Sequence, residues 1–443
     1  MGSEVVRRHL QYSFCTMRLF LFVAAFAGWT LVVQAQQSLV PVTVLHAARV
    51  LDVSGGVVLS PGEVLVEGTR IREVGTHVAR PAGAVVIDLG DTTLMPGMID
   101  AHVHLFLHPG AEDLQTVQES VPQRTLQAAE AAKADVMAGF TAERDMGTEG
   151  AKCADVAVRN AINQGSIPGP RMRVSCNAID ILGGHEDAVG YNPEQRVLSN
   201  ADYANTADEI VAVMREQRKD GADFTKIYET GRDHLSGDTF STPYQYTEAQ
   251  LAAAVAEAHR TGSRVGVHCT GEPGASYAVE AGVASIDHAH NLSPATMKMM
   301  REKQIYAVPT FQIMEYFGEH PQRGDGAADR EQLVFHAAEF RKQMAAGVPF
   351  AVGSDVGPFP HGIQAHEMEL MVKYGMSPVD VLRADLINGA KLLDWADTIG
   401  QLKPGFYADV IAVPGNPLEN IGVLKHPTFV MKNGEVLVHG SAR

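Results

Sequence analysis

The chain has 443 residues, of which 45% are hydrophobic and 20% are charged, and its formal net charge at pH 7 is −16. This is the composition of an ordinary globular protein, and it excludes a fibrous or wholly disordered chain. The acidic balance argues against nucleic acid and anionic membranes as partners, because both require a basic surface.

The first 35 residues have the pattern of a secretory signal peptide. Arg18 precedes an apolar run over residues 19–33, which ends in the small-x-small cleavage pattern Val33-Gln34-Ala35. The run is shorter than the ~20 residues that span a bilayer, and no stop-transfer charges follow it. We therefore expect an exported protein, periplasmic or secreted, with no stable membrane span after residues 1–35 are removed.

Removal of this segment would change the net charge from −16 to −18, because three Arg and one Glu are lost. Met1 and Met17 are both candidate start residues. Of the four cysteines, Cys153, Cys176 and Cys269 would remain. An odd number allows one disulfide at most and argues against a disulfide scaffold.

Strand-rich segments lie at both ends of the remaining chain. Residues 42–91 contain short strand-like runs broken by Gly, Pro and Asp. Residues 406–440 have the same character, with Asn433-Gly434 as a hairpin turn signal. We predict one composite β-sandwich built from both termini, with its first part in residues 36–97 and its second in residues 396–443.

Residues 98–395 alternate strand-like and helix-like segments, the latter with the periodicity of amphipathic helices, as in TLQAAEAAKADVMAG. Eight βα units predict an α/β fold, a (β/α)8 TIM-type barrel with its active site at the C-terminal ends of the strands. A doubly wound sheet is the alternative, but it would carry a Gly-rich fingerprint after its first strand. The predicted barrel strands are 98–104, 139–145, 172–178, 223–229, 264–268, 284–288, 305–309 and 350–355.

The first barrel strand lies in MPGMIDAHVHL, which contains His102 and His104. Side chains at i and i+2 of a strand point to one face, so the two imidazoles can bind one ion together. A chance His-x-His pair is the alternative, and the residues downstream decide between the two. At the ends of three other predicted strands stand His268 in VGVHCTG, His288 in SIDHAHN and Asp355 in AVGSDVG.

Lys226 in DFTKIYE, on the fourth predicted strand, is the remaining candidate. Imidazole and carboxylate groups bind Zn²⁺, whereas an ammonium group has no lone pair to offer. Burial drives a lysine toward the neutral amine, which can add CO₂ to become a carbamate, an anionic ligand that can bridge two metals. A strand lysine that extends to solvent is the alternative; the other candidate ligands favour the carbamate.

The chain resembles the amidohydrolase superfamily, and within it the imidazolonepropionase-like branch that includes Xaa-Pro dipeptidases. The resemblance covers essentially the whole chain after the signal peptide, and it indicates a metal-dependent hydrolase more specifically than it indicates a substrate. The matching stretches are MPGMIDAHVHL, GFTAERDMG, GGHED, FTKIYE, VGVHCTG, IDHAHN, VGSDVGPFPHG and INGAKLLDWADTIGQLKPGFYADVIAV.

The resemblance implies two divalent metal ions, with zinc as the expected metal, and assembly as a homo-oligomer, for which the sequence carries no feature of its own. His290, the second imidazole of IDHAHN, is an ambiguous position, and we expect it to lie outside the ligand set. The implied ligands are His102, His104 and Asp355 for one metal, His268 and His288 for the other, and carboxylated Lys226 as the bridge.

The predicted activity is hydrolysis of an amide or peptide bond that releases a C-terminal amino acid from a small peptide or an N-acyl amino acid. A hydroxide between the two metals would attack the carbonyl, and Asp355 would carry the proton to the leaving nitrogen. A cyclic amidase of imidazolonepropionase type, or a lactonase, would use the same metals. A mononuclear deaminase has no use for Lys226, and a non-catalytic scaffold should have lost at least one ligand.

Substrate preference is expected to lie in the loops. Tyr228 and His234 match by position a tyrosine and a histidine that the resembling dipeptidases use to bind a carboxylate. Arg232, in the same loop, His185 in GGHED and His361 in PFPHG are further candidate donors. We interpret Arg144 as a structural ion-pair residue. We also interpret three histidines as structural, because they lie in loop or helix contexts: His108, His259 and His336.

Overall fold

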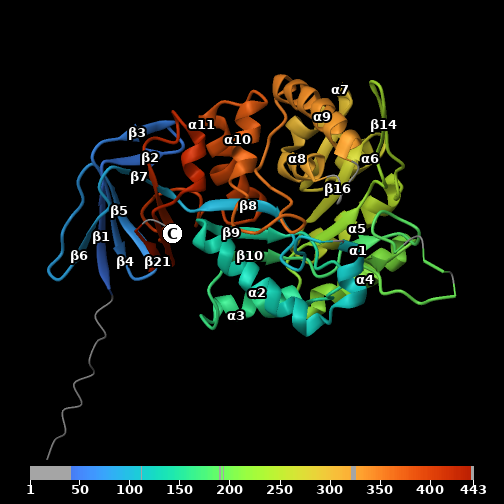
Figure 1. Cartoon of the computed structure of the whole chain (residues 1–443), viewed down its shortest axis with the longest axis horizontal. Helices are drawn as coiled ribbons and strands as arrows, with labels where there is room; N and C mark the ends of the chain where they lie inside the picture. Colours follow the sequence, from blue (N-terminus) through green and yellow to red (C-terminus); the bar gives the residue numbers. More distant parts are fainter. Residues whose placement is uncertain (1–40, 111, 189–190, 193, 321–325, 441–443) are drawn as a thin grey trace, which may run out of the picture. The chain divides into compact units, whose positions relative to one another are not determined.

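The computed structural model describes residues 41–110, 112–188, 191–192, 194–320 and 326–440. The predicted signal peptide lies outside the described residues. None of the helices in the described part of the chain is both long enough and apolar enough to cross a membrane. Strands and helices alternate through the middle of the chain, and strands predominate on either side of it (Figure 1).

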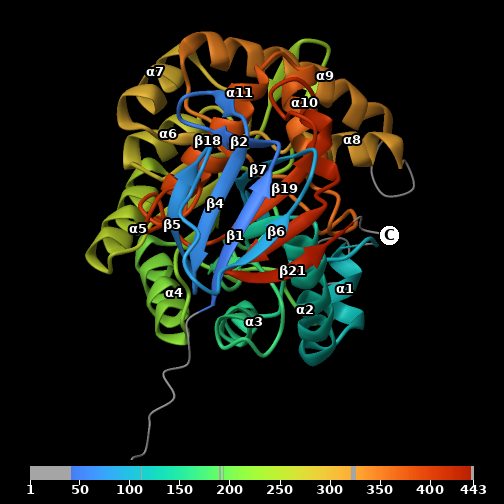
Figure 2. The same ribbon diagram turned by 90° about the vertical axis from the view of Figure 1, so that its left-hand side faces the viewer.

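Strands from both ends of the sequence form a β-sandwich. They are β1 (Val42–Ala47), β2 (Arg49–Asp52), β3 (Val57–Leu59), β4 (Gly62–Glu67), β5 (Arg70–Gly75), β6 (Val85–Asp88), β7 (Thr92–Pro96), β19 (Val410–Pro414), β20 (Phe429–Lys432) and β21 (Glu435–His439). One sheet has the order β5-β4-β1-β6 and the other β21-β20-β19-β7-β2-β3. The antiparallel pairing of β7 with β19 joins the two ends of the chain, shown in blue and red in Figure 2. The predicted composite sandwich is confirmed.

Parallel strands form the barrel. They are β8 (Met98–Val103), β9 (Phe140–Asp145), β10 (Arg171–Val174), β11 (Ile179–Asp180), β12 (Asp202–Tyr203), β13 (Thr225–Tyr228), β16 (Val265–Gly271), β17 (Ser285–Asn291) and β18 (Tyr306–Val308). They pair in the orders β10-β9-β8 and β12-β11-β13-β16-β17-β18. Seven of the eight predicted barrel strands overlap strands of the structure.

The eighth predicted strand, residues 350–355, is not a regular strand. Isolated parallel bridges join Phe350 to Ala307 of β18 and Val356 to Val103 of β8, so the segment still lies between the last strand and the first. Asp355 has a left-handed backbone (φ +60°), which interrupts an extended ladder. A Cβ on Gly353 would lie 2.8 Å from the Cβ of His102 on β8, so glycine allows this close approach.

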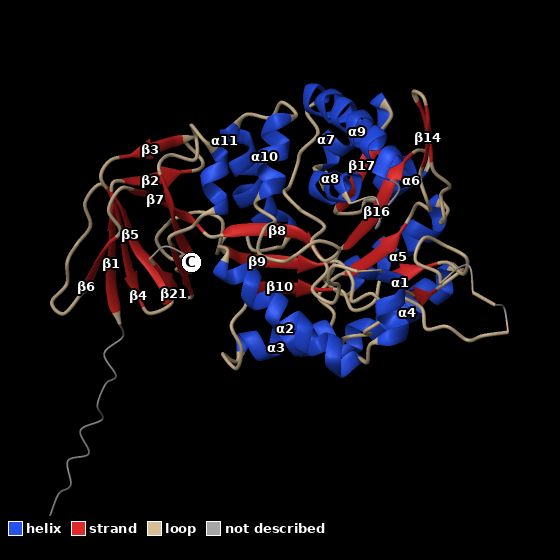
Figure 3. Ribbon diagram, in the orientation of Figure 1, coloured by secondary structure: helices blue, strands red, loops and turns tan. Residues whose placement is uncertain are grey.

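Helices surround the parallel strands (Figure 3). Several begin at strong caps; for example, Thr206 and Thr247 each form a capping box with the residue three positions later. A small antiparallel hairpin, β14 (His234–Ser236) and β15 (Thr239–Ser241), follows β13. The helices are α1 (Glu112–Gln118), α2 (Val121–Met137), α3 (Ala154–Asn163), α4 (Ala207–Asp220), α5 (Glu248–Arg260), α6 (Gly274–Ala281), α7 (Pro294–Lys303), α8 (Phe311–Glu319), α9 (Gly326–Ala346), α10 (His366–Lys373), α11 (Pro378–Leu382), α12 (Gly389–Leu392), the π-helix η1 (Arg383–Asn388) and the 3-10 helix η2 (Ile421–Lys425).

Cys153 and Cys176 form a disulfide, and Cys269 is free and buried. The expectation of one disulfide at most is confirmed. The bond joins the residue before α3 to a residue just after β10, 23 positions later.

Reduction of this disulfide is expected to lower the free energy of unfolding by about 3 kcal/mol, because the closed loop restricts the unfolded chain. Urea unfolding with and without a phosphine reductant measures the change. The double variant Cys153→Ala, Cys176→Ala is the control, since the reductant should not alter its midpoint. Equal midpoints for the oxidised and reduced wild type would contradict the prediction.

Candidate metal centre

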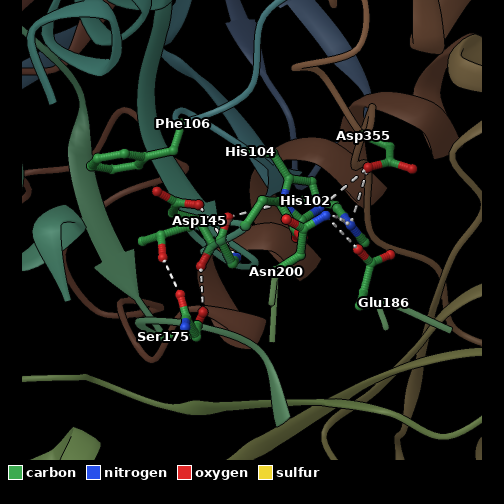
Figure 4. A network of polar contacts seen from close by, with 12 residues as sticks. His102, His104, Phe106, Asp145, Ser175, Glu186, Asn200 and Asp355 are labelled. Atoms are coloured by element: carbon green, nitrogen blue, oxygen red, sulfur yellow. Dashed lines mark hydrogen bonds and ion pairs between the residues drawn. The ribbon is translucent and has the colours of Figure 1, made fainter. Parts of the chain in front are cut away.

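Three side chains at the C-terminal ends of β8 and of residues 350–356 bring their ligand atoms together. The Nε2 atoms of His102 and His104 lie 3.2 Å apart, and Oδ1 of Asp355 lies 3.4 Å from each of them (Figure 4). Donor atoms about 2.0–2.2 Å from one tetrahedral ion are separated by about 3.3–3.6 Å. The spacing of these three atoms therefore fits a shared metal ion.

His288 and His268 adjoin these three residues. The rings of His102 and His288 lie 5.2 Å apart, and those of His268 and His288 lie 4.3 Å apart. His288, His102 and Asp355 also offer ligand atoms that all lie within 4.8 Å of one another. Nε2 of His268 is buried with no hydrogen-bond partner among the described residues. The cluster of candidate donors therefore extends beyond His102, His104 and Asp355.

Lys226 is fully buried on β13, and its Nζ has no hydrogen-bond partner in the described part of the chain. Burial lowers the pKa of this ammonium group, although the nearby carboxylates of Asp287 and Asp355 oppose the shift. An unpaired buried charge costs several kcal/mol, so burial shifts this lysine toward the neutral amine. A neutral, unpaired amine is the form of lysine that can react with CO₂.

Hydrogen bonds to Nδ1 orient two of the imidazoles. Nδ1 of His104 lies 3.0 Å from the carbonyl oxygen of Gly147, and Nδ1 of His288 lies 2.8 Å from the Thr310 hydroxyl. Such contacts fix the ring and leave Nε2 as the free ligand atom. Burial lowers the pKa of His102, of His268 and of His288 and so favours the neutral, metal-binding imidazole.

The backbone at two candidate ligands is unusual. His288 has φ +75° and Asp355 has φ +60°, conformations that residues other than glycine adopt infrequently. Strained backbone of this kind concentrates at functional sites, where the surrounding structure holds it in place. The fold thus keeps both side chains directed at the cluster at some cost in local stability.

Arg144 forms a buried ion pair with Asp287 (2.9 Å) and also donates to the Ala101 carbonyl. The expected structural role of Arg144 is therefore confirmed. Oδ1 of Asp287 in turn lies 3.6 Å from Nδ1 of His102. The pair holds a carboxylate behind the metal ligands and supplies its counter-charge.

Tyr228 and His185 form one wall beside the cluster. Their rings stack at 5.0 Å with an interplanar angle of 12°, and the His185 ring lies 4.2 Å from that of His268. Nδ1 of His185 has no hydrogen-bond partner among the described residues. Both side chains are therefore placed where a substrate bound at the cluster would meet them.

The other predicted substrate residues, Arg232, His234 and His361, do not form part of this wall. Arg232 and His234 are exposed on the loop and strand after β13, and neither side chain forms a hydrogen bond or ion pair with the cluster within the described residues. His361 is largely buried, with Nδ1 2.7 Å from the Asp135 carboxylate on α2, so it anchors its loop to that helix. His336 is also buried, bonded to the Pro309 carbonyl, as expected of a structural histidine.

Sequence reasoning missed two acidic residues next to the cluster. Oε1 of Glu149 lies 3.2 Å from Nδ1 of His104 and accepts the Tyr228 hydroxyl at 3.3 Å. Burial, and then the neighbouring Glu149, raise the pKa of Glu186 to about 7. Both acids follow predicted strands, in TEG and GGHED, and that position is the signal that would have identified them.

His290, the ambiguous position, lies near the cluster but has its own partner. Nδ1 of His290 is 3.2 Å from Asp233, in the loop after β13, and its ring is 6.0 Å from that of His288. Asp233, also missed by sequence reasoning, accepts a second hydrogen bond from Thr270. Nε2 of His290 is buried with no hydrogen-bond partner among the described residues, so the exclusion of His290 from the ligand set stays a prediction.

A parallel barrel that presents histidines and a carboxylate at its strand ends is typical of hydrolases. The profile of the amidohydrolase family matches residues 93–437, and the chain belongs to this family. It is accordingly a hydrolase that acts on carbon–nitrogen bonds, in a family whose members are typically metal-dependent.

Three relatives show the extent of the similarity. Ochratoxinase of Aspergillus niger is 29% identical over an alignment of 372 positions that covers 77% of this chain and 75% of that protein. The structure of a Xaa-Pro dipeptidase with methionine bound in its active site has 29% identity and a TM-score of 0.82, and the match covers 90% of this chain and 100% of the other. A prolidase in complex with N-methylphosphonate-L-proline has 26% identity and a TM-score of 0.81 with the same coverage.

Proposed function

We propose that this protein is an exported, binuclear metal-dependent amidohydrolase that releases the C-terminal amino acid of a dipeptide or an N-acyl amino acid. The observation that carries the proposal is the contact of His102, His104 and Asp355 at 3.2–3.4 Å beside the unpaired amine of Lys226. The similarity to a Xaa-Pro dipeptidase and a prolidase supports the substrate class.

The donors present fit the metals that the family implies, since neutral imidazoles, a carboxylate and a carbamate are ligands that zinc accepts. Bound metals would supply a water nucleophile of lowered pKa and polarise the scissile carbonyl. One metal would be held by His102, His104 and Asp355, the second by His268 and His288, and both by carboxylated Lys226.

Asp355 is the residue placed to move the proton. Its Oδ1 faces both Nε2 atoms, and 15% of its side chain remains exposed, so the carboxylate borders the cluster and the space above it. The carboxylate would take the proton of the attacking water and deliver it to the leaving nitrogen. An amide nitrogen leaves poorly unless it is protonated, so this transfer is needed for turnover.

Tyr228 and His185 are the side chains placed to bind the substrate carboxylate. Tyr228 is buried, and its hydroxyl donates a hydrogen bond to the Glu149 carboxylate. A substrate carboxylate at this wall would replace that contact and would bring the adjacent amide bond to the cluster. The neighbouring Glu149 and Glu186 oppose an anion there unless they are protonated, and burial raises the pKa of both.

The substitution Tyr228→Phe is expected to raise KM for an Xaa-Pro dipeptide about tenfold with little change in kcat, because a hydrogen bond to a charged group is worth roughly 1.5–3 kcal/mol. Steady-state kinetics measure both constants. The C-terminal amide of the same dipeptide is the matched control, and its KM should not change. An equal effect on acid and amide substrates would remove Tyr228 from this role.

The proposed function is tested by metal analysis of the purified protein together with hydrolysis of Xaa-Pro, Xaa-Arg and N-acyl-Phe substrates. Two metals per chain and cleavage of free-acid amides are expected, with activity lost on chelation and restored by zinc. Activity confined to cyclic amides or lactones would favour the alternative function, that of a cyclic amidase or lactonase. The similarity to the imidazolonepropionase of Shouchella clausii, 24% identical over 431 residues, supports that alternative. One metal or none would contradict the bridging Lys226.

Export and assembly are part of the proposal. The mature protein should begin near Gln36 when it is recovered from the medium or the periplasm, and sequencing of its N-terminus tests this. Light scattering after gel filtration tests the expected homo-oligomer. A cytoplasmic protein that retains residues 1–35, or a monomer, would contradict the respective expectation.

A further inference from the structure

An arginine-lined cavity of about 430 Å³ lies at the N-terminal end of the barrel. Phe224, Arg264 and Ala284, each the residue immediately before a barrel strand, line it. The metal-centre residues stand on the strands or follow their C-terminal ends, so the cavity opens at the other end of the barrel. It is separate from the site described above.

The cavity carries an excess of positive charge in an acidic chain. Four arginines line it, Arg144, Arg173, Arg218 and Arg264, against the two carboxylates of Asp223 and Asp394. The lining therefore has a net charge of +2, whereas the whole chain has −16. Two residues outside the lining form ion pairs with it: Arg159 pairs with Asp223, and Asp287 pairs with Arg144. Their opposite charges cancel, so the net charge of +2 is unchanged.

The arginines extend from a buried floor to an open rim. The side chain of Arg144 is 4% exposed, that of Arg173 is 28% exposed and that of Arg264 is 42% exposed. A Cβ on Gly266 would lie 3.0 Å from Nη1 of Arg144, so the glycine keeps the floor clear. A Cβ on Gly262 would meet nothing within 4 Å, so the rim is open to solvent.

Much of the donor capacity of these arginines is not used by the protein. Arg173 donates from Nε to the Leu393 carbonyl, and its Nη1 lies 3.7 Å from Asp223, beyond hydrogen-bond distance. Arg218 donates from Nη1 to the Ala222 carbonyl. No other hydrogen bond from either side chain is formed within the described residues, although a guanidinium has five N–H donors. The Trp395 ring covers one face of Arg173 at 4.5 Å and leaves the edge donors available.

The Arg173 guanidinium is partly buried beside other charged groups. Burial lowers the pKa of the Arg173 guanidinium; Asp223 and then Asp394 oppose this shift, and Arg159 and Arg218 add to it by smaller amounts. A bound anion would offset the burial of the guanidinium charge and would accept hydrogen bonds from several arginines at once.

We propose that this cavity binds a small phosphate monoester. A dianionic phosphate matches the net charge of +2, and its oxygens can accept from arginines that approach from different sides. The volume falls in the range of small-molecule pockets and exceeds what a phosphate group alone needs, so room remains for an organic substituent.

Isothermal titration of the intact, metal-containing protein with glycerol 3-phosphate, inorganic phosphate and citrate tests the proposal. Glycerol 3-phosphate is expected to bind, and Arg173→Gln and Arg218→Gln are each expected to raise its Kd about tenfold or more. Arg218 is exposed, so its replacement should leave folding unchanged. Arg72→Gln, which alters an exposed arginine of the sandwich, is the matched control with unchanged Kd.

A variant with the opposite effect sharpens the test. Asp394→Asn should tighten binding several-fold, because Arg264 would lose its paired carboxylate and could turn to the ligand. Absence of binding to the wild type at millimolar ligand would overturn the proposal. Binding that persists unchanged in both arginine variants would place the anion elsewhere, the metal centre included. Tighter binding of citrate than of glycerol 3-phosphate would overturn the phosphate class.

Discussion

Replacement of Asp355 by Asn is expected to lower kcat by about 10²–10⁴-fold while the fold is retained, because an amide side chain cannot take the proton from the attacking water. Asn is the informative substitution at this position. It has nearly the same shape as Asp and is among the few residues that tolerate a left-handed backbone such as φ +60°. The loss can then be assigned to the chemistry of the side chain rather than to strain.

Steady-state kinetics, circular dichroism and metal analysis should be made on the same preparation. Asp91→Asn is the matched control, since Asp91 is exposed in the sandwich and pairs with Arg49. Its kcat and metal content should equal those of the wild type. A near-normal kcat for Asp355→Asn would exclude Asp355 from proton transfer, whereas loss of metal along with activity would restrict its role to that of a ligand.

Replacement of Lys226 by Ala is expected to abolish activity and to lower the metal content below two per chain. The side chain is fully buried and its amine unpaired, so the loss removes the proposed bridging ligand without breaking a hydrogen bond. The variant also leaves a cavity of the length of the lysine chain. Added acetate or propionate should enter it, supply two oxygens in place of the carbamate and restore part of both activity and metal content.

Lys152→Ala is the control for this substitution, because the Lys152 side chain is 73% exposed and should affect neither quantity. Carbon-13 NMR after incubation with labelled bicarbonate adds an independent readout. A carbamate signal is expected in the wild type and not in Lys226→Ala. Two metals per chain with normal turnover in the variant would contradict the bridging role.

Local pattern accounts for the success of the fold prediction. The helix-like periodicity of TLQAAEAAKADVMAG corresponds to α2, whose N-terminus is capped by the side chain of Ser120. The strand that carries His102 could be recognised for the same reason, because apolar runs and turn residues determine structure over a few positions. Residues 350–355 do not form the expected strand. Their conformation is set by contacts with β8, which is distant in sequence, at Gly353 and next to Asp355.

The sequence by itself determined the residue types and the approximate strand ends at which His102, His104, Lys226, His268, His288 and Asp355 stand. Only the tertiary structure decided which of their atoms meet, and that the Gly147 carbonyl and the Thr310 hydroxyl orient two of the rings. It also decided that Glu149 and Glu186 border the cluster, whereas Arg232 and His234 remain exposed. It also brought four arginines from separate elements into one cavity. The reason is physical: side-chain type and periodicity are local properties, whereas backbone acceptors, burial and the convergence of distant side chains arise only when the chain packs.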